Sequence, residues 1–256
     1  MPQTILVARN GRGRLTITLN RPDRGNAFDQ TMLDELGAAM AEAAADARVR
    51  LVVIAAAGRH FCTGADMRAR GAGAPAGLTL NEVLALIDGC PKPVIGVVEG
   101  GCLGGGLGLA ACCDLLLGAT TAFFSVPELR VGVAPSAELT GLLMRAMGSR
   151  ALRRYGLTGE RLSAEDALRL GLLHEIVASE ALANRLEAIE DNILLNAPEA
   201  TGEFKATMAG LSLPARAQLF PQGGTPRRGL ERSAEAAEGI AAFKEKRKPA
   251  WYPAAD

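Results

Sequence analysis

The sequence has few of the residues that build metal and redox sites. Only two histidines occur in 256 residues, so a histidine-rich metal site is nearly excluded. The five cysteines are an odd number and do not form paired CxxC motifs, which argues against a disulfide framework or a zinc ribbon. We expect them to be reduced, mostly buried, small apolar residues. The sequence therefore predicts neither a metal nor a bound cofactor.

The chain also lacks an excess of charge of either sign. Lysine plus arginine and aspartate plus glutamate both number 28, so the formal net charge is zero and no overall field attracts nucleic acid or a membrane surface. No segment reaches the roughly 18 apolar residues that a membrane span requires, and the first residues lack the apolar core of a signal peptide. We expect a soluble, cytoplasmic protein with no nucleic-acid or membrane partner.

The apolar residues that are present indicate an α/β fold. An apolar content of 48% is enough for one large domain, or for one domain with an appendage. Residues 15–19 alternate between apolar and polar and predict a half-buried strand, while residues 30–45 have apolar positions at helical spacing. Residues 51–54 are all apolar, as in a strand covered on both faces. This order favours a parallel sheet with crossover helices.

One glycine-rich stretch organises the rest of the chain. The pattern predicts a buried strand at 94–99, a turn at 100–106, a helix at 107–113 and a second strand at 115–118. The glycines before the helix leave backbone N–H groups and the positive end of the helix dipole open, which would stabilise an anionic oxygen. Close packing of a helix on a strand explains an isolated glycine-rich turn equally well.

Two other features fit a site. Glu128 follows Pro127 in an otherwise apolar segment, so we expect a partly buried carboxyl group with a raised pKa. A second turn ends in Gly64 and can expose the backbone N–H of Ala65. The loop at 68–78, rich in glycine, alanine and proline, is expected to be mobile beside such a site.

Several ordered motifs resemble the crotonase superfamily, the enoyl-CoA hydratase/isomerase family. They are HFCTGADM, GGCLGGGLGLAACCDLLL and FFSVPELRVG, with RPDRGNAF before them and LTGERLSAEDALRLGLLHEIV and GIAAFKEKRKPAW after them. The resemblance covers essentially the whole chain. It implies a spiral of ββα units over residues 1–195 and a helical C-terminal trimerisation region over residues 196–256, with homotrimers often stacked into hexamers.

The resemblance also implies roles in the chemistry. In this family two backbone amides hold the thioester oxygen of an acyl-CoA, and the matching positions are Ala65 and Gly105. Hydratases of the family usually carry two glutamates; the second matches Glu128, whereas Gly108 stands where the first is expected. Glu138 either replaces that missing acid from another wall of the pocket or stabilises the start of a helix as a first-turn acid.

Other matching positions belong to substrate binding. Arg24 and Arg68 match positions near the adenine and phosphates of CoA, and Phe243 and Lys246 match the C-terminal element that closes over it. Asp66 is expected to orient its loop, and Met67 beside it belongs to the same set of substrate-binding positions. CoA would enter as part of the substrate, so no separate cofactor is expected.

The leading hypothesis is a lyase that adds water to a 2-enoyl-CoA through an enolate held in an oxyanion hole. The first alternative is a double-bond isomerase that uses a single acid/base, and the second is an acyl-CoA-binding member without catalysis. A thioester hydrolase is a weaker choice, because Ser125 and Ser136 have no histidine near them in sequence. His174 is expected to be structural.

Overall fold

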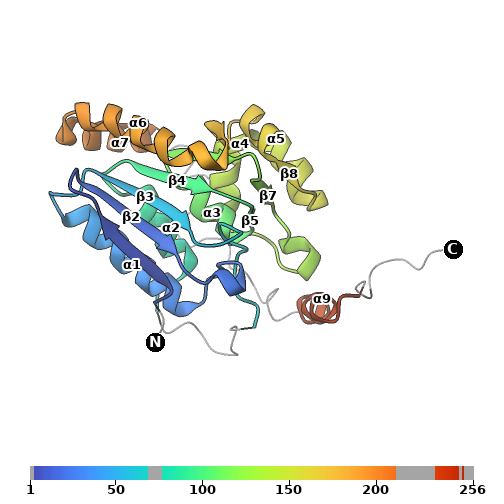
Figure 1. Cartoon of the computed structure of the whole chain (residues 1–256). Coiled ribbons are helices and arrows are strands. Elements are labelled where there is room, and N and C mark those ends of the chain that lie inside the picture. The colour runs from blue at the N-terminus through green and yellow to red at the C-terminus, as the bar shows by residue number, and fades with distance from the viewer. Residues whose placement is uncertain (1–2, 69–76, 212–233, 248–249, 251–256) are drawn as a thin grey trace.

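The computed structural model of the chain describes residues 3–68, 77–211, 234–247 and 250, and it contains two sheets flanked by helices (Figure 1). The large sheet has the order β1-β2-β3-β4-β6-β9, in which only β1 is antiparallel to its neighbour. Its strands are β1 (Ile5–Arg9), β2 (Arg14–Leu19), β3 (Leu51–Ala56), β4 (Val94–Val98), β6 (Leu115–Ala119) and β9 (Glu175–Val177). The small sheet consists of β5 (Gly101–Leu103), β7 (Phe123–Ser125) and β8 (Leu162–Ser163).

From β4 to β7, consecutive strands alternate between the two sheets, so this part of the chain forms turns of a spiral. β4 lies in the large sheet and β5 in the small one, and β6 and β7 repeat this step one turn later. A helix follows each pair, so the repeating unit is ββα, as expected. The helices are α1 (Gln30–Ala45), α2 (Leu80–Asp88), α3 (Gly105–Ala111), α4 (Ala137–Thr158), α5 (Ala164–Arg169), α6 (Leu182–Leu195), α7 (Pro198–Leu211) and α9 (Ala234–Glu245), with short 3-10 turns η1 (Pro22–Arg24), η2 (Glu128–Val131) and η3 (Ser179–Ala181).

Hydrophobic cores cover both faces of the large sheet. On one face, α1 and α2 pack against the sheet together with α3, and on the other α6 does so (Figure 1). In β3, Val52 and Ile54 belong to the first core while Leu51 and Val53 belong to the second. This alternation explains why the strand is apolar at every position, and it confirms the predicted parallel sheet.

Local sequence signals place several helix ends. Asp29 accepts a hydrogen bond from the backbone N–H of Met32 and caps α1, and Thr79 with Glu82 forms a capping box at the start of α2. A serine followed by an acid three positions later predicts a helix start at Ser163, and this is confirmed, because its hydroxyl accepts a hydrogen bond from the N–H of Asp166. None of the helices in the described ranges has the length and apolar content to cross a bilayer.

Two expectations about the elements need correction, and one is confirmed. α3 begins at Gly105, two positions before the predicted start, because contacts from neighbouring elements fix a helical turn that glycine alone disfavours. Apolar spacing predicts helices at 137–147 and 151–157, and this is confirmed: α4 consists of two helical segments that meet at a kink, where the backbone of Gly148 is non-helical with φ 77° and ψ 157°. The strands β1, β5, β7 and β8 were not predicted. The central part of the expected loop at 68–78 lies outside the described residues. So do residues 221–224, whose sequence Pro-Gln-Gly-Gly predicts a bend between helices.

A buried ion pair joins α6 to the large sheet. The carboxylate of Glu190 is 1% exposed, and it accepts hydrogen bonds from Arg14 at 2.9 Å and from Asn10 at 2.8 Å. We expect Glu190→Gln to lower the free energy of unfolding by about 3 kcal/mol, because it leaves the Arg14 charge without its partner. Denaturant titration measures this. Glu187→Gln, on the exposed face of the same helix, is the control, and equal losses in both variants would contradict the assignment.

Candidate active site

Two turns meet at the edge of the small sheet. Cys62 and Cys102 pair as an isolated parallel bridge, so the chain runs in the same direction through both segments. Ala65 follows Cys62 by three positions and Gly105 follows Cys102 by the same number, which brings the two residues to equivalent places in successive turns of the spiral. A Cβ atom added to Gly64 would lie 3.7 Å from the backbone nitrogen of Gly105. The structure therefore brings the two predicted turns together.

The backbone amide of Ala65 has a fixed direction. The carbonyl oxygen of Gly64 accepts a hydrogen bond of 2.9 Å from the N–H of Phe28. In a trans peptide the C=O and N–H groups point in opposite directions, so this bond aims the N–H of Ala65 away from Phe28. A second bond of 2.9 Å, from the N–H of Asp66 to the carbonyl of Phe28, fixes the next peptide group. Neither Ala65 nor Gly105 donates a backbone hydrogen bond to any described residue.

The second amide lies at the N-terminus of α3. The carbonyl of Gly104 accepts hydrogen bonds from the N–H groups of Leu107 and Gly108, at 2.9 and 3.2 Å, so the N–H of Gly105 in the same peptide group points out of the helix. Gly104 has φ 54° and ψ −125°, a combination that residues with a Cβ avoid. The sharp turn into α3 thus requires glycine.

Glu128 reaches the same turn from η2. A Cβ on Gly104 would lie only 2.6 Å from the Oε1 atom of Glu128, so the carboxylate occupies the space beside the turn that carries the Gly105 amide. Glu128 is the first residue of η2 and is half-buried. The structure therefore places the predicted acid next to one of the two predicted amides.

Leucine side chains line the position of the missing glutamate. A Cβ on Gly108 would lie 3.1 Å from Leu139 Cδ1, and 3.3 and 3.5 Å from the two methyl groups of Leu84. Both leucines are buried. Leu139 is thus the residue of α4 that faces Gly108, while Glu138 precedes it in the first turn of a helix that Ser136 caps. This position suits the role of a first-turn acid.

Charged residues surround the Ala65 turn. The guanidinium of Arg21 pairs with Asp66 at 2.9 Å and with Asp29 at 3.1 Å, so Asp66 is tied to the segment before α1. Arg24, in η1, and Arg68 are exposed, and neither forms an ion pair with a carboxylate in the described part of the chain. Their charges remain open to solvent. Met67, between Asp66 and Arg68, is half-buried.

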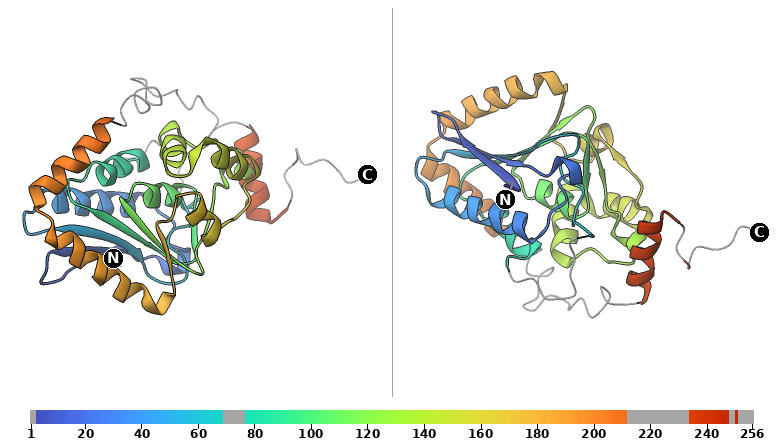
Figure 2. Two further views of the ribbon diagram at one scale, coloured as in Figure 1. Left: turned by 90° about the horizontal axis from the view of Figure 1, so that it is seen from above. Right: turned by 60° about the horizontal axis from the view of Figure 1, so that its bottom comes forward.

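The helix that carries the predicted C-terminal residues lies on η2. A Cβ on Gly239, in α9, would lie 2.6 Å from the carbonyl carbon of Val131, so the two backbones are in close contact. Figure 2 shows α9 at the edge of the molecule, far from α6 and α7. Phe243 is 64% exposed and Lys246, just after the helix, is also exposed. The same chain therefore supplies both Glu128 and the element predicted to close over CoA.

The other reactive groups do not form a nucleophilic site. Burial raises the pKa of the Cys62 thiol to about 12, which makes it a poor nucleophile at neutral pH. Ser125 donates to the carbonyl of Gly159 and Ser136 to Asn81, so neither hydroxyl is hydrogen-bonded to a histidine. Among the described residues, no three His, Cys, Asp or Glu side chains are arranged to hold a metal ion.

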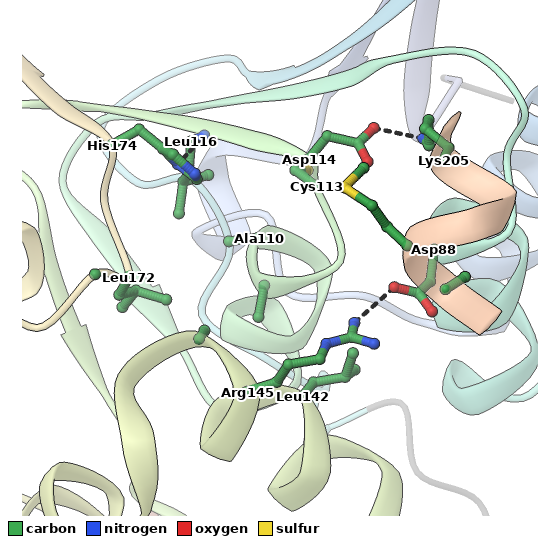
Figure 3. Close-up of a pocket in the computed structure, with 15 residues that line it drawn as sticks. Asp88, Ala110, Cys113, Asp114, Leu116, Leu142, Arg145, Leu172, His174 and Lys205 are labelled. Carbon is green, nitrogen blue, oxygen red and sulfur yellow. Dashed lines mark hydrogen bonds and ion pairs between the residues drawn. The ribbon is translucent and has the colours of Figure 1, made fainter. Parts of the chain in front are cut away.

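A cavity of about 320 Å³ lies at the opposite end of α3 (Figure 3). Two ion pairs cross it, Arg145 with Asp88 at 2.6 Å and Lys205 with Asp114 at 2.5 Å. His174 lines the same cavity, and its Nδ1 atom accepts from the N–H of Leu116 in β6, which is a structural contact. None of the residues predicted for the active site lines this cavity.

A spiral of ββα turns in which two glycine turns approach each other, with a carboxylate beside one of them, is typical of a crotonase fold. A family model described as enoyl-CoA hydratase/isomerase matches residues 10–253. A probable enoyl-CoA hydratase of Rhodobacter capsulatus is 35% identical over 93% of both chains, and an (E)-benzylidenesuccinyl-CoA hydratase of Thauera aromatica is 32% identical over 92% of this chain and 94% of that one. A crystal structure of an enoyl-CoA hydratase/isomerase from Pseudoalteromonas atlantica superposes with a TM-score of 0.85 at 28% identity, covering 97% of this chain and 99% of that one. The chain belongs to the enoyl-CoA hydratase/isomerase family.

Several residues that pack against the two turns were not predicted as site residues from the sequence. Phe28 and Leu80 both contact Gly105, since a Cβ there would lie 2.7 Å from the ring and 2.8 Å from a leucine methyl group. Arg21 and the fully buried Asn26 were quoted only as part of a motif. Asn26 has a positive φ of 53°, which is uncommon for a residue other than glycine. The only sequence signal for this conformation is an asparagine that follows a glycine.

We expect Gly104→Ala to impair the site more than Gly108→Ala does. The first change strains the backbone by about 1–3 kcal/mol and forces its Cβ against the Glu128 carboxylate. A displacement of about 1 Å at such a group can cost about a hundredfold in rate. Gly108→Ala adds the same methyl group against leucine methyls only. Turnover of enoyl-CoA substrates by both variants measures the difference, and equal losses would contradict the placement of Glu128 beside Gly104.

Proposed function

We propose that the protein catalyses the reversible hydration of a 2-enoyl-CoA thioester. The observation that supports this proposal is the approach of the turn before Ala65 to the backbone nitrogen of Gly105, with the carboxylate of Glu128 beside Gly104. Two preorganised N–H donors stabilise negative charge on a carbonyl oxygen, and an adjacent carboxylate can move a proton. Family membership and the hydratase names of the relatives support the same reaction.

In the proposed reaction the thioester carbonyl accepts hydrogen bonds from Ala65 and Gly105. Glu128 takes a proton from water as the water oxygen bonds to C3 of the substrate, and the electrons of the C2=C3 double bond move to give an enolate on the thioester oxygen. The protonated Glu128 then returns its proton to C2, which gives the 3-hydroxyacyl-CoA. The amides bind best when the charge on oxygen is greatest, so they lower the barrier rather than the energy of the bound substrate.

The CoA end of the substrate would lie across η1 and the loop after Ala65. Arg24 and Arg68 are exposed cations without a carboxylate partner among the described residues, as phosphate binding requires. Phe243 and Lys246, on and just after the helix that packs on η2, would close over the same end. CoA is part of the substrate in this proposal, and no separate cofactor takes part.

A double-bond isomerase is the second candidate, and the wall at Gly108 favours it. Because Leu84 and Leu139 line that wall, no second carboxylate faces the site from position 108. An isomerase needs only one group, which removes a proton from C2 of a 3-enoyl-CoA and returns it to C4. A chain that only binds acyl-CoA would carry out neither reaction, and it would not exchange the C2 proton with solvent.

We propose that the protein is cytoplasmic and assembles as a homotrimer or a hexamer. Large apolar side chains remain exposed on the two helices that follow the spiral, which supports association between copies. Leu195 at the end of α6 is 85% exposed, and Phe204 on α7 is 64% exposed. Light scattering of the purified protein measures the mass of the assembly.

We expect Glu128→Gln to lower kcat by about a hundredfold to ten-thousandfold, because the amide can neither accept nor return the proton. Loss of the conjugated enoyl absorbance, followed with straight, branched and glutaconyl-type esters, measures hydration, and its gain from 3-enoyl esters measures isomerisation. Glu138→Gln is the comparison and should retain turnover, because Leu139 rather than Glu138 faces Gly108. Unchanged turnover of every ester by Glu128→Gln would refute the assignment.

We expect Arg24→Ala and Arg68→Ala each to raise KM for an acyl-CoA by about tenfold, since a charge-assisted hydrogen bond to phosphate contributes about 1.5–3 kcal/mol. The same variants should show no change with acyl-pantetheine thioesters, which lack the nucleotide. Steady-state kinetics with both substrate types separates binding of the nucleotide from a general effect on the loop. An equal rise with both would contradict the proposed CoA site.

A further inference from the structure

Phe28 contacts both turns of the candidate site by different means. Its backbone N–H donates to the carbonyl of Gly64 and its carbonyl accepts from Asp66, both at 2.9 Å. Its ring packs on the other turn, because a Cβ on Gly105 would lie 2.7 Å from Cζ and 2.9 Å from Cε1 of the ring. The residue is 8% exposed, so the ring has little freedom to move.

We propose that Phe28 is a positioning residue that sets the separation between the Ala65 and Gly105 amides. This inference rests on the proposed function, in which both amides bind one oxygen atom. Two donors can do so only when each lies about 2.7–3.1 Å from that oxygen, so a small change in their separation weakens one of the two hydrogen bonds.

The ring is the part of this support that a substitution can remove. The hydrogen bonds to Gly64 and from Asp66 come from the backbone and survive a change of side chain. Gly105 has no side chain of its own, and the ring of Phe28 and a methyl group of Leu80 fill the space that a Cβ would take. Without the ring edge, the first turn of α3 has space to move toward Phe28, while the Ala65 amide keeps its direction.

Three variants of Phe28 differ in how far the side chain extends toward Gly105. Phe28→Ala removes the whole ring, and Phe28→Leu keeps the first part of the side chain but ends before the positions of Cε1 and Cζ. Phe28→Met extends nearly as far as the ring edge and should restore the contact. Leu36→Ala, a truncation in the same hydrophobic core on α1, controls for a general loss of stability.

Infrared spectroscopy of bound butyryl-CoA, labelled with ¹³C at the thioester carbon, tests this proposal. The shift of the carbonyl stretching frequency on binding measures how strongly the two amides polarise the carbonyl oxygen. Butyryl-CoA is saturated and has no double bond to hydrate. We expect a shift to lower frequency in the wild type, a smaller shift in Phe28→Ala and Phe28→Leu, and a nearly full shift in Phe28→Met and Leu36→Ala. For the first two, kcat should fall about tenfold or more with KM changed less than about threefold, since only part of one donor's effect is lost.

The outcomes separate this inference from the proposed function. If the wild type polarises the carbonyl and Phe28→Leu does so equally, with kcat unchanged, the positioning role of Phe28 is wrong while the proposed function stands. If the wild type itself produces no shift, the oxyanion site is wrong, and the role of Phe28 with it. Phe28→Leu decides the question if Phe28→Ala does not fold.

Discussion

The hydrogen bond from the N–H of Phe28 to the carbonyl of Gly64 is the constraint on which the candidate site depends. A peptide group is planar, so fixing its oxygen also fixes the direction of the N–H on the other side. The N–H of Ala65 is therefore oriented by a hydrogen bond to the carbonyl of the same peptide group, and the N–H itself makes no hydrogen bond to a described residue. At the second turn the helix performs the same task, because the carbonyl of Gly104 is held by the next turn of α3 while the N–H of Gly105 stays open.

Glycine serves three separate purposes within five positions of α3 and the turn before it. At Gly104 the backbone dihedral angles require it, at Gly105 the ring of Phe28 takes the space of a side chain, and at Gly108 two leucines do so. Only the first two bear on the amide and the acid. The third places two leucine side chains at position 108, where the family resemblance implies a second glutamate.

The elements with a clear periodicity could be predicted from the sequence. β3 was predicted because its residues are apolar at every position. α1 was predicted because its apolar residues recur at helical spacing. The strands of the small sheet are two or three residues long, too short to show a period, and their partners lie far away in the sequence. A common site for Ala65, Gly105 and Glu128 was predicted from the motifs, and it stays a prediction. The contact of Phe28 with Gly105 was not, because no local pattern links a side chain in one turn of the spiral to a backbone in the next.

The contact of α9 with η2 has a consequence for the order in which the molecule assembles. It joins residue 131 to residue 239, whereas the bridges and hydrogen bonds that build the two glycine turns link segments much closer in the chain. Closing a longer loop costs more conformational entropy, so contacts of this kind form late in folding and open early under stress. The contact of α9 with η2 should therefore form after the spiral itself and open before global unfolding.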